Sequence, residues 1–192
     1  MRYSESSALN EVYELIAVFY EAQFRESHSA QRAMIIAAAL VELGEHRSWA
    51  SVWWAYGAIH HDLSDEALKR ALDLLSEVAT PDPARAAALM LGAEIKFSQA
   101  LNAGEEPNPR EQVSLLAEAS RLAPDWPSIR VRLARALHEA RRDDLAREHA
   151  EVAVTLVGPT RSADPFDTAI SGRGLRPGWV HDELNALGLL TG

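Results

Sequence analysis

Four side chains near the start of the chain combine aromatic surface with polar edges. They follow one another at intervals of four, three and four residues: Trp49, Trp53, Tyr56 and His60. On a helix this spacing places all four on one face. Aromatic side chains with a polar edge are frequent anchors for a partner chain. The stripe therefore predicts a peptide-binding surface, and its packing against the preceding helical segments is the alternative.

A second cluster is cationic and lies between residues 130 and 147. This window holds six arginines and three acidic residues, although the whole chain has a formal net charge of -9. Within it, Arg132, Arg135 and His138 share one helical face. Because guanidinium forks suit carboxylates and phosphates, this face predicts recognition of an acidic or C-terminal peptide segment. The alternative is a solvated face with local ion pairs such as Arg135 with Glu139.

The histidines give little reason to expect a metal centre. His60, His61 and Asp62 are consecutive, and adjacent residues on a helix point about 100° apart. The chain contains no His-Glu-x-x-His pattern, in which two histidines four apart bind zinc. His138 and His149 lie on different predicted helices, and nothing places a third ligand beside them. We therefore expect no metal and no other cofactor.

Other catalytic signatures are equally weak. The glycine-rich residues 171–178 lack the Gly-Lys-Ser/Thr ending of a nucleotide loop, and no strand is predicted before them. The chain has no cysteine that could act as a nucleophile. Neither a Ser-His-Asp arrangement nor a carboxylate pair can be singled out. We therefore expect a protein that is not an enzyme.

Composition narrows the class further. The chain has 192 residues, of which 47% are hydrophobic and 24% charged, and these values are typical of a globular protein. Its negative charge disfavours general nucleic-acid binding. The longest apolar run, residues 33–41, is far shorter than the roughly 20 residues of a membrane-spanning helix. With no secretory-signal pattern and no cysteine, we expect a cytoplasmic protein without membrane or nucleic-acid partners.

Helical periodicity dominates the sequence, and no stretch alternates as a strand would. Glycine, proline and capping residues divide the chain into eight main helices and a short last one. The expected ranges are 7–26, 30–43, 47–60, 64–78, 84–101, 110–122, 128–140, 143–157 and 179–189. The predicted fold class is all-α. A helical domain would cover residues 1–158, and residues 159–192 would add a loop and a C-terminal helix that packs on the same domain.

The clearest tertiary pattern lies between residues 133 and 153. Two short helices joined by a polar turn would set one group of residues against three alanines: Leu133, Ala134 and Leu137 against Ala146, Ala150 and Ala153. Small residues at the crossing let two backbones approach closely. This pattern resembles the second half of a tetratricopeptide repeat. Such a pair cannot bury its apolar face alone, so it must stack on neighbouring pairs.

The resemblance covers about three helix pairs between residues 47 and 158, with faults. The second pair has a longer connection than the family's short turn, and Gln112 replaces the small residue that opens its second helix. Residues 1–46 would form a degenerate pair or a cap. The resemblance implies a right-handed superhelix of antiparallel helix pairs with a C-terminal capping helix. An irregular helical bundle is the alternative.

The resemblance also implies a function. In similar proteins the first helix of each pair lines a concave groove that holds peptides. This chain would then be a protein–protein interaction scaffold, with the aromatic stripe as apolar anchor and Arg132, Arg135 and His138 as charge recognition. The Asn residues of the family's carboxylate clamp are absent. A structural or oligomerisation module, including a homodimer through the tail helix, and a small helical enzyme accessory using histidines are the alternatives.

Overall fold

The computed structural model describes most of the chain between residues 35 and 190. The described residues are 35, 37–41, 47–61, 64–80, 84–157, 164, 166 and 178–190. Within these ranges the regular secondary structure is helical and contains no strand, which confirms the predicted all-α class. Most of the first two predicted helices and most of the segment between residues 158 and 177 lie outside the described residues.

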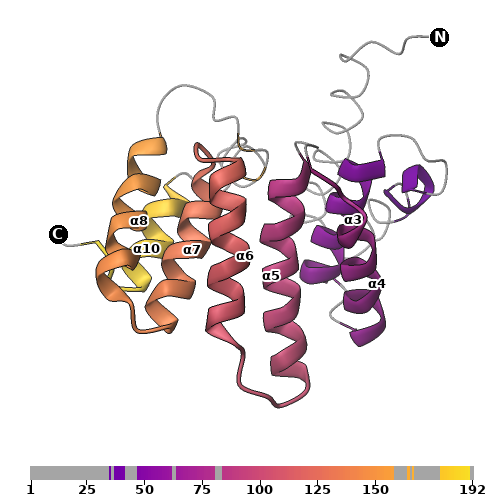
Figure 1. Cartoon of the computed structure of the whole chain (residues 1–192), viewed down its shortest axis with the longest axis horizontal. Coiled ribbons are helices and arrows are strands. Elements are labelled where there is room, and N and C mark those ends of the chain that lie inside the picture. The colour runs from indigo at the N-terminus through magenta and orange to yellow at the C-terminus, as the bar shows by residue number, and fades with distance from the viewer. Residues whose placement is uncertain are drawn as a thin grey trace, which may run out of the picture. The chain divides into compact units, whose positions relative to one another are not determined.

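The chain divides into two compact units, Met1–Glu105 and Glu106–Gly192, here called the N-terminal and C-terminal units. The N-terminal unit contains α3 (Arg47–His61), α4 (Asp65–Ser76) and α5 (Ala84–Asn102). The C-terminal unit contains α6 (Pro109–Leu122), α7 (Pro127–Glu139), α8 (Asp143–Leu156) and α10 (Trp179–Ala186) (Figure 1). The ends of these helices lie within a few residues of the predicted ones. The predicted pairing of residues 84–101 with 110–122 would join the two units, and it stays a prediction.

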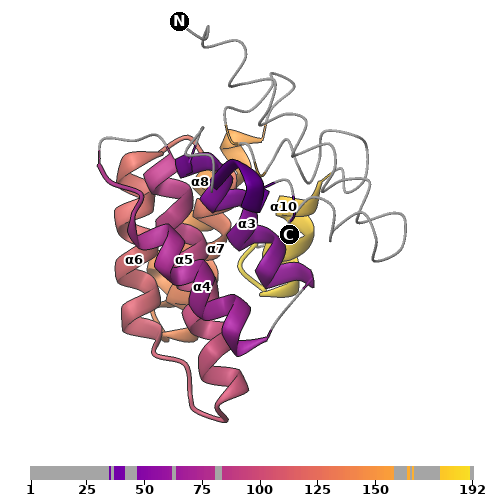
Figure 2. The ribbon, with the colours of Figure 1, turned by 90° about the vertical axis from the view of Figure 1, so that its right-hand side faces the viewer.

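In the N-terminal unit, α3 and α4 form a hairpin and α5 packs against both helices (Figures 1 and 2). The cap predicted at Ser64 is confirmed, because its hydroxyl accepts a hydrogen bond from the Ala67 N–H at 3.3 Å. Asp65 and Glu66 follow in the first turn of α4. Negative charge at that position complements the positive end of the helix. Local sequence therefore fixes where α4 begins.

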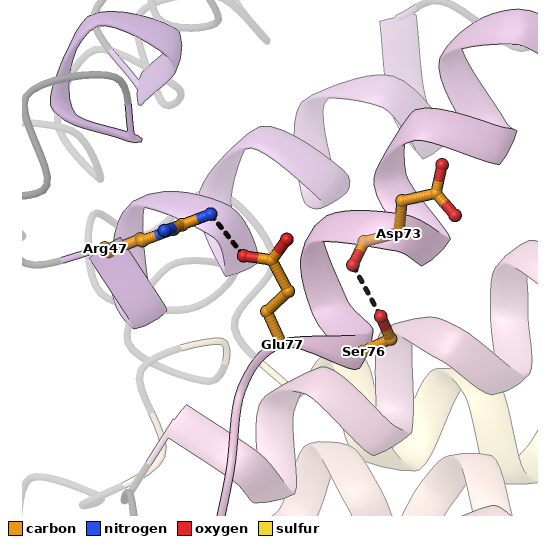
Figure 3. Close-up of polar contacts among 4 residues, drawn as sticks. All are labelled: Arg47, Asp73, Ser76 and Glu77. Atoms are coloured by element: carbon orange, nitrogen blue, oxygen red, sulfur yellow. Dashed lines mark hydrogen bonds and ion pairs between the residues drawn. The ribbon is translucent and has the colours of Figure 1, made fainter.

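An ion pair joins the start of α3 to the end of α4. Arg47, the first residue of α3, forms an ion pair with Glu77, the residue that follows α4 (Figure 3). Beside it, the Ser76 hydroxyl donates to the Asp73 carbonyl at 2.7 Å (Figure 3). The start of α3 therefore lies beside the end of α4, as an antiparallel pair requires. Since Arg47 and Glu77 are both exposed, their ion pair adds little to stability.

The first two-thirds of α5 is buried on nearly every side. Its buried positions are Ala84, Ala86, Ala87, Ala88, Leu89, Met90, Leu91, Gly92, Ala93 and Ile95. A helix that is apolar all round belongs in the interior of a protein. At its end, the Asn102 amide donates to the Asp65 carboxylate at 3.2 Å and ties α5 to the start of α4.

In the C-terminal unit, α7 and α8 form the hairpin that the sequence predicts. All six residues expected at the crossing are buried, with exposed fractions of 3% or less: Leu133, Ala134, Leu137, Ala146, Ala150 and Ala153. The turn between the helices places Arg141 at φ 59°, in the left-handed region. There the Arg141 and Arg142 N–H groups donate to the carbonyls of His138 and Leu137, each at 2.9 Å. These bonds satisfy the last carbonyls of α7.

Two further helices pack on this hairpin. α6, capped by the Asn108 side chain and opened by Pro109, packs against α7. α10 contacts both α7 and α8. Its docking buries four apolar residues at and after the helix: Trp179, Val180, Leu184 and Leu189. The sequence left open whether this helix covers the last pair, folds back toward the groove or docks on another copy, and here it covers α7 and α8 of its own chain.

A distant carboxylate caps the first turn of α7. Trp126 stands at the cap position and makes no side-chain cap bond. Instead Asp164, which is fully buried, accepts from the Ser128 N–H at 2.8 Å through Oδ2 and from the Phe166 N–H at 2.9 Å through Oδ1. The Phe166 ring lies edge-on to Trp126, with centroids 6.3 Å apart. Residues 164 and 166 are thereby fixed to the start of α7.

Candidate functional site

The aromatic stripe lies on α3, and its middle is buried. Trp53 is 0% exposed and Tyr56 4% exposed, whereas Trp49 is half-buried and His60 is exposed. The rings form a row: the centroids of Trp53 and Tyr56 are 5.5 Å apart, and those of Tyr56 and His60 are 4.3 Å apart. A fully buried ring offers no surface to a partner. Burial of Trp53 and Tyr56 therefore favours the alternative in which this part of the stripe packs inside the protein.

The predicted cationic face lies on α7. We call Arg132, Arg135 and His138 the α7 strip. Arg132 is half-buried and donates from Nη1 to the Ser128 carbonyl at 3.2 Å, one turn earlier on the same helix. The side chains of Arg135 and His138 are 47% and 37% exposed. The three predicted residues thus lie on one helix, in a different unit from the aromatic stripe.

Arg135 is paired with a residue from another helix. Its Nη2 forms an ion pair with the Glu183 carboxylate of α10, and the Glu183 side chain is 26% exposed. The sequence suggested a local pair with Glu139, four residues further along α7. Docking of α10 brings Glu183 to Arg135 instead. This pair links the α7 strip to the tail helix.

His138 also holds a carboxylate. Its Nδ1 lies 2.8 Å from Oδ1 of Asp143, the first residue of α8, and the Asp143 side chain is 49% exposed. An ionised carboxylate only accepts hydrogen bonds, so Nδ1 of His138 carries the hydrogen. The α7 strip therefore contacts two carboxylates, one from α8 and one from α10.

An arginine–histidine contact outside the α7 strip joins α7 to α8. Arg130 donates from Nε and Nη2 to the Pro124 carbonyl at 3.3 and 3.2 Å, and its Nη1 lies 3.0 Å from Nδ1 of His149. A guanidinium has no acceptor, so His149 accepts at Nδ1 and is neutral. Burial and, next, the Arg130 charge hold the pKa of His149 below its ordinary value, and Glu148 acts in the opposite sense. Arg130 thus joins the α6–α7 connection and α8 to α7.

The described residues contain no group of three or more His, Cys, Asp or Glu side chains placed to hold a metal ion. His138 and His149 have different partners. The side chain of His61 and all of Asp62 lie outside the description. The arginine and histidine side chains of α7 take part in ion pairs and hydrogen bonds.

Sequence reasoning missed the carboxylates that meet the α7 strip. The sequence predicted Asp143 only as the first residue of a helix. It predicted Glu183 only as a polar residue of the amphipathic tail helix. Glu183 lies 48 residues from Arg135 in the sequence, so no local spacing relates them. The capping role of Asp164, 36 residues from Ser128, had no local signal either.

Three comparisons with known proteins identified no similar protein. A scan against protein-family models, a search of curated proteins and a search of solved structures each found no match for this chain. Among the helices that the structure describes, none has the length and apolar character needed to cross a membrane.

Proposed function

We propose that this protein is a non-enzymatic scaffold that binds an acidic segment of a partner protein along the α7 strip. One observation carries the proposal: Arg135 and His138 stand one turn apart, partly exposed, and each already contacts a carboxylate. Contacts between charged donors and carboxylates are among the stronger protein hydrogen bonds. An acidic side chain or a C-terminal carboxylate of a partner presents the same chemical group.

We further propose that the helices stack as in tetratricopeptide proteins. In each unit a helical hairpin is covered by a third helix that contacts both of its members, α5 on α3 and α4, and α10 on α7 and α8. Such coverage is expected where each pair hides its apolar face against the next element. The buried alanines of α8 support the same proposal. In a right-handed stack, α7 would be the first helix of its pair and would line the concave groove.

The aromatic stripe has a smaller part in this proposal. Trp49 and His60 are the positions at which a partner reaches the stripe, because they retain exposed surface. The buried rings of Trp53 and Tyr56 hold the row in place, with His60 stacked at a tilt on Tyr56. We therefore assign charge recognition to α7 and only peripheral contact to α3.

The test is binding of a fluorescently labelled hexaglutamate peptide, followed by anisotropy. Arg135→Ala should weaken binding about three- to tenfold, which corresponds to the loss of one charge-assisted contact. Arg147→Ala is the matched control, because Arg147 is an exposed arginine on α8 that faces Asp144 at 3.8 Å. It removes the same charge from a residue outside the α7 strip and should leave affinity nearly unchanged. Equal losses in both variants, or no binding by the native chain, would contradict the proposal.

A further inference from the structure

We infer that the chain's own carboxylates occupy the α7 strip, and that an acidic partner binds by displacing them. The inference rests on the proposed function and concerns the regulation of the same face. Glu183 and Asp143 are the internal occupants. They hold Arg135 and His138, and they come from two different helices.

The positions of the two contacts define what a partner must present. Arg135 and His138 are three residues apart on α7, which separates their Cβ atoms by about 5–6 Å. Each cationic or donor group meets one carboxylate. A partner that replaces both must therefore carry two acidic groups about one helical turn apart. Aspartate or glutamate residues at i and i+3 or i+4 of a helix meet this requirement, as do closely spaced acids in an extended segment.

The contacts are exposed enough to exchange. The Arg135 and Glu183 side chains are 47% and 26% exposed, and those of His138 and Asp143 are 37% and 49% exposed. Ion pairs at such exposure contribute little to stability, so breaking them costs little. Displacement therefore requires side-chain rotation and no unfolding.

The docking of α10 does not depend on Glu183. Four buried apolar residues hold the tail helix on α7 and α8: Trp179, Val180, Leu184 and Leu189. The Glu183 carboxylate can leave Arg135 while these residues stay in place. α10 thus stays in place while the Glu183 carboxylate competes with the partner's acidic groups for Arg135.

Removing the internal carboxylates should raise affinity for the hexaglutamate peptide. Glu183→Gln and Asp143→Asn keep the size of each side chain and remove its charge, and each should tighten binding about two- to fivefold. The matched controls are Asp182→Asn on α10 and Asp144→Asn on α8, which change the net charge equally. Asp182 is exposed, and Asp144 faces Arg147. Both controls should bind like the native chain.

A double-mutant comparison assigns the gain to the contact itself. In the Arg135→Ala background, Glu183→Gln should give no increase, because its partner is gone. If Arg135→Ala weakens binding but Glu183→Gln behaves like Asp182→Asn, the inference is overturned while the proposed function stands. If only the Glu183→Gln/Asp143→Asn double variant binds, the proposed function is overturned for the native chain, whereas occupation of the α7 strip by its own carboxylates is supported. Failure of both native chain and double variant to bind overturns both.

Discussion

His149 links the protonation of one side chain to the packing of α7 against α8. Its Nδ1 accepts from Arg130, which also holds the Pro124 carbonyl before α7. A proton at Nδ1 would remove this acceptor and place two cations side by side. Burial opposes the charged ring as well, and the pKa of His149 is accordingly lowered. The neutral state of this histidine is therefore part of the folded structure.

The C-terminal unit should lose stability at acidic pH partly through His149. Because its folded-state pKa lies below the unfolded value of about 6.5, the unfolded chain binds the proton more readily. The contribution is complete above about pH 6.5 and is lost as the pH falls through the folded-state pKa. Urea unfolding between about pH 7.5 and 5 should show a smaller pH-dependent loss for His149→Asn, which keeps an acceptor for Arg130, than for the native chain. His181→Asn, at an exposed site on α10, is the control, and parallel curves for all three proteins would refute this link.

At the scale of elements, three helix ends use the same hydrogen-bonded turn with different residues. Gly104 and Gly188 take the left-handed conformation after α5 and α10, at φ 69° and 67°. Arg141 takes it after α7, at φ 59°, and is the only non-glycine residue with positive φ among those that the structure describes. A side chain disfavours this conformation, whereas glycine adopts it freely. We therefore expect the left-handed conformation of Arg141 to lower the stability of the α7–α8 turn.

Arg141→Gly should stabilise the protein. The left-handed conformation costs a non-glycine residue about 1–2 kcal/mol, and the extra freedom of glycine in the unfolded chain offsets about 0.5–1 kcal/mol of this. A net gain of up to about 1.5 kcal/mol should appear as a higher Tm. Arg142→Gly is the control, because Arg142 has φ -108°, which lies outside the left-handed region that favours glycine. A Tm that falls equally in both variants would show that Arg141 is not strained.

Elements were predictable where spacing along the chain carried the information. The α7–α8 crossing is an example, because its buried residues recur with helical spacing on both sides of a polar turn. The orientation of α3 was not predictable in this way. Every residue from position 50 to 58 is buried, so its apolar residues define no single inner face. The sequence placed Trp53 and Tyr56 on one face correctly, but it could not say whether that face meets solvent.

The contacts at the candidate site depend on tertiary docking. Local spacing suggested Glu139 as the partner of Arg135, yet the docking of α10 supplies Glu183. Asp164, which follows α8 in the sequence, caps the start of α7. This contact also depends on how distant segments pack. Side chains on one helix can be grouped by periodicity, whereas partners from distant segments follow only from how the helices pack. The placement of Arg132, Arg135 and His138 on one helix was therefore predictable. The carboxylates that contact Arg135 and His138 were not.

At the scale of the whole molecule, the α7 strip is a group of basic side chains on a protein with a negative net charge. The chain carries a formal net charge of -9, which repels an acidic partner at long range. At about 0.15 M salt, charges more than about 8 Å apart are largely screened. We therefore expect the proposed binding at that salt concentration to depend on direct contacts with Arg135 and His138.

The most direct test of the α7 binding face is amide chemical-shift mapping by NMR at about 0.15 M salt. Titration with the unlabelled hexaglutamate peptide should shift amides between residues 132 and 138, together with those of Asp143 and Glu183. The amides of α4, in the N-terminal unit, should stay unchanged. Shifts centred on another helix, or no shifts at saturating peptide, would contradict the assignment of the binding face to α7.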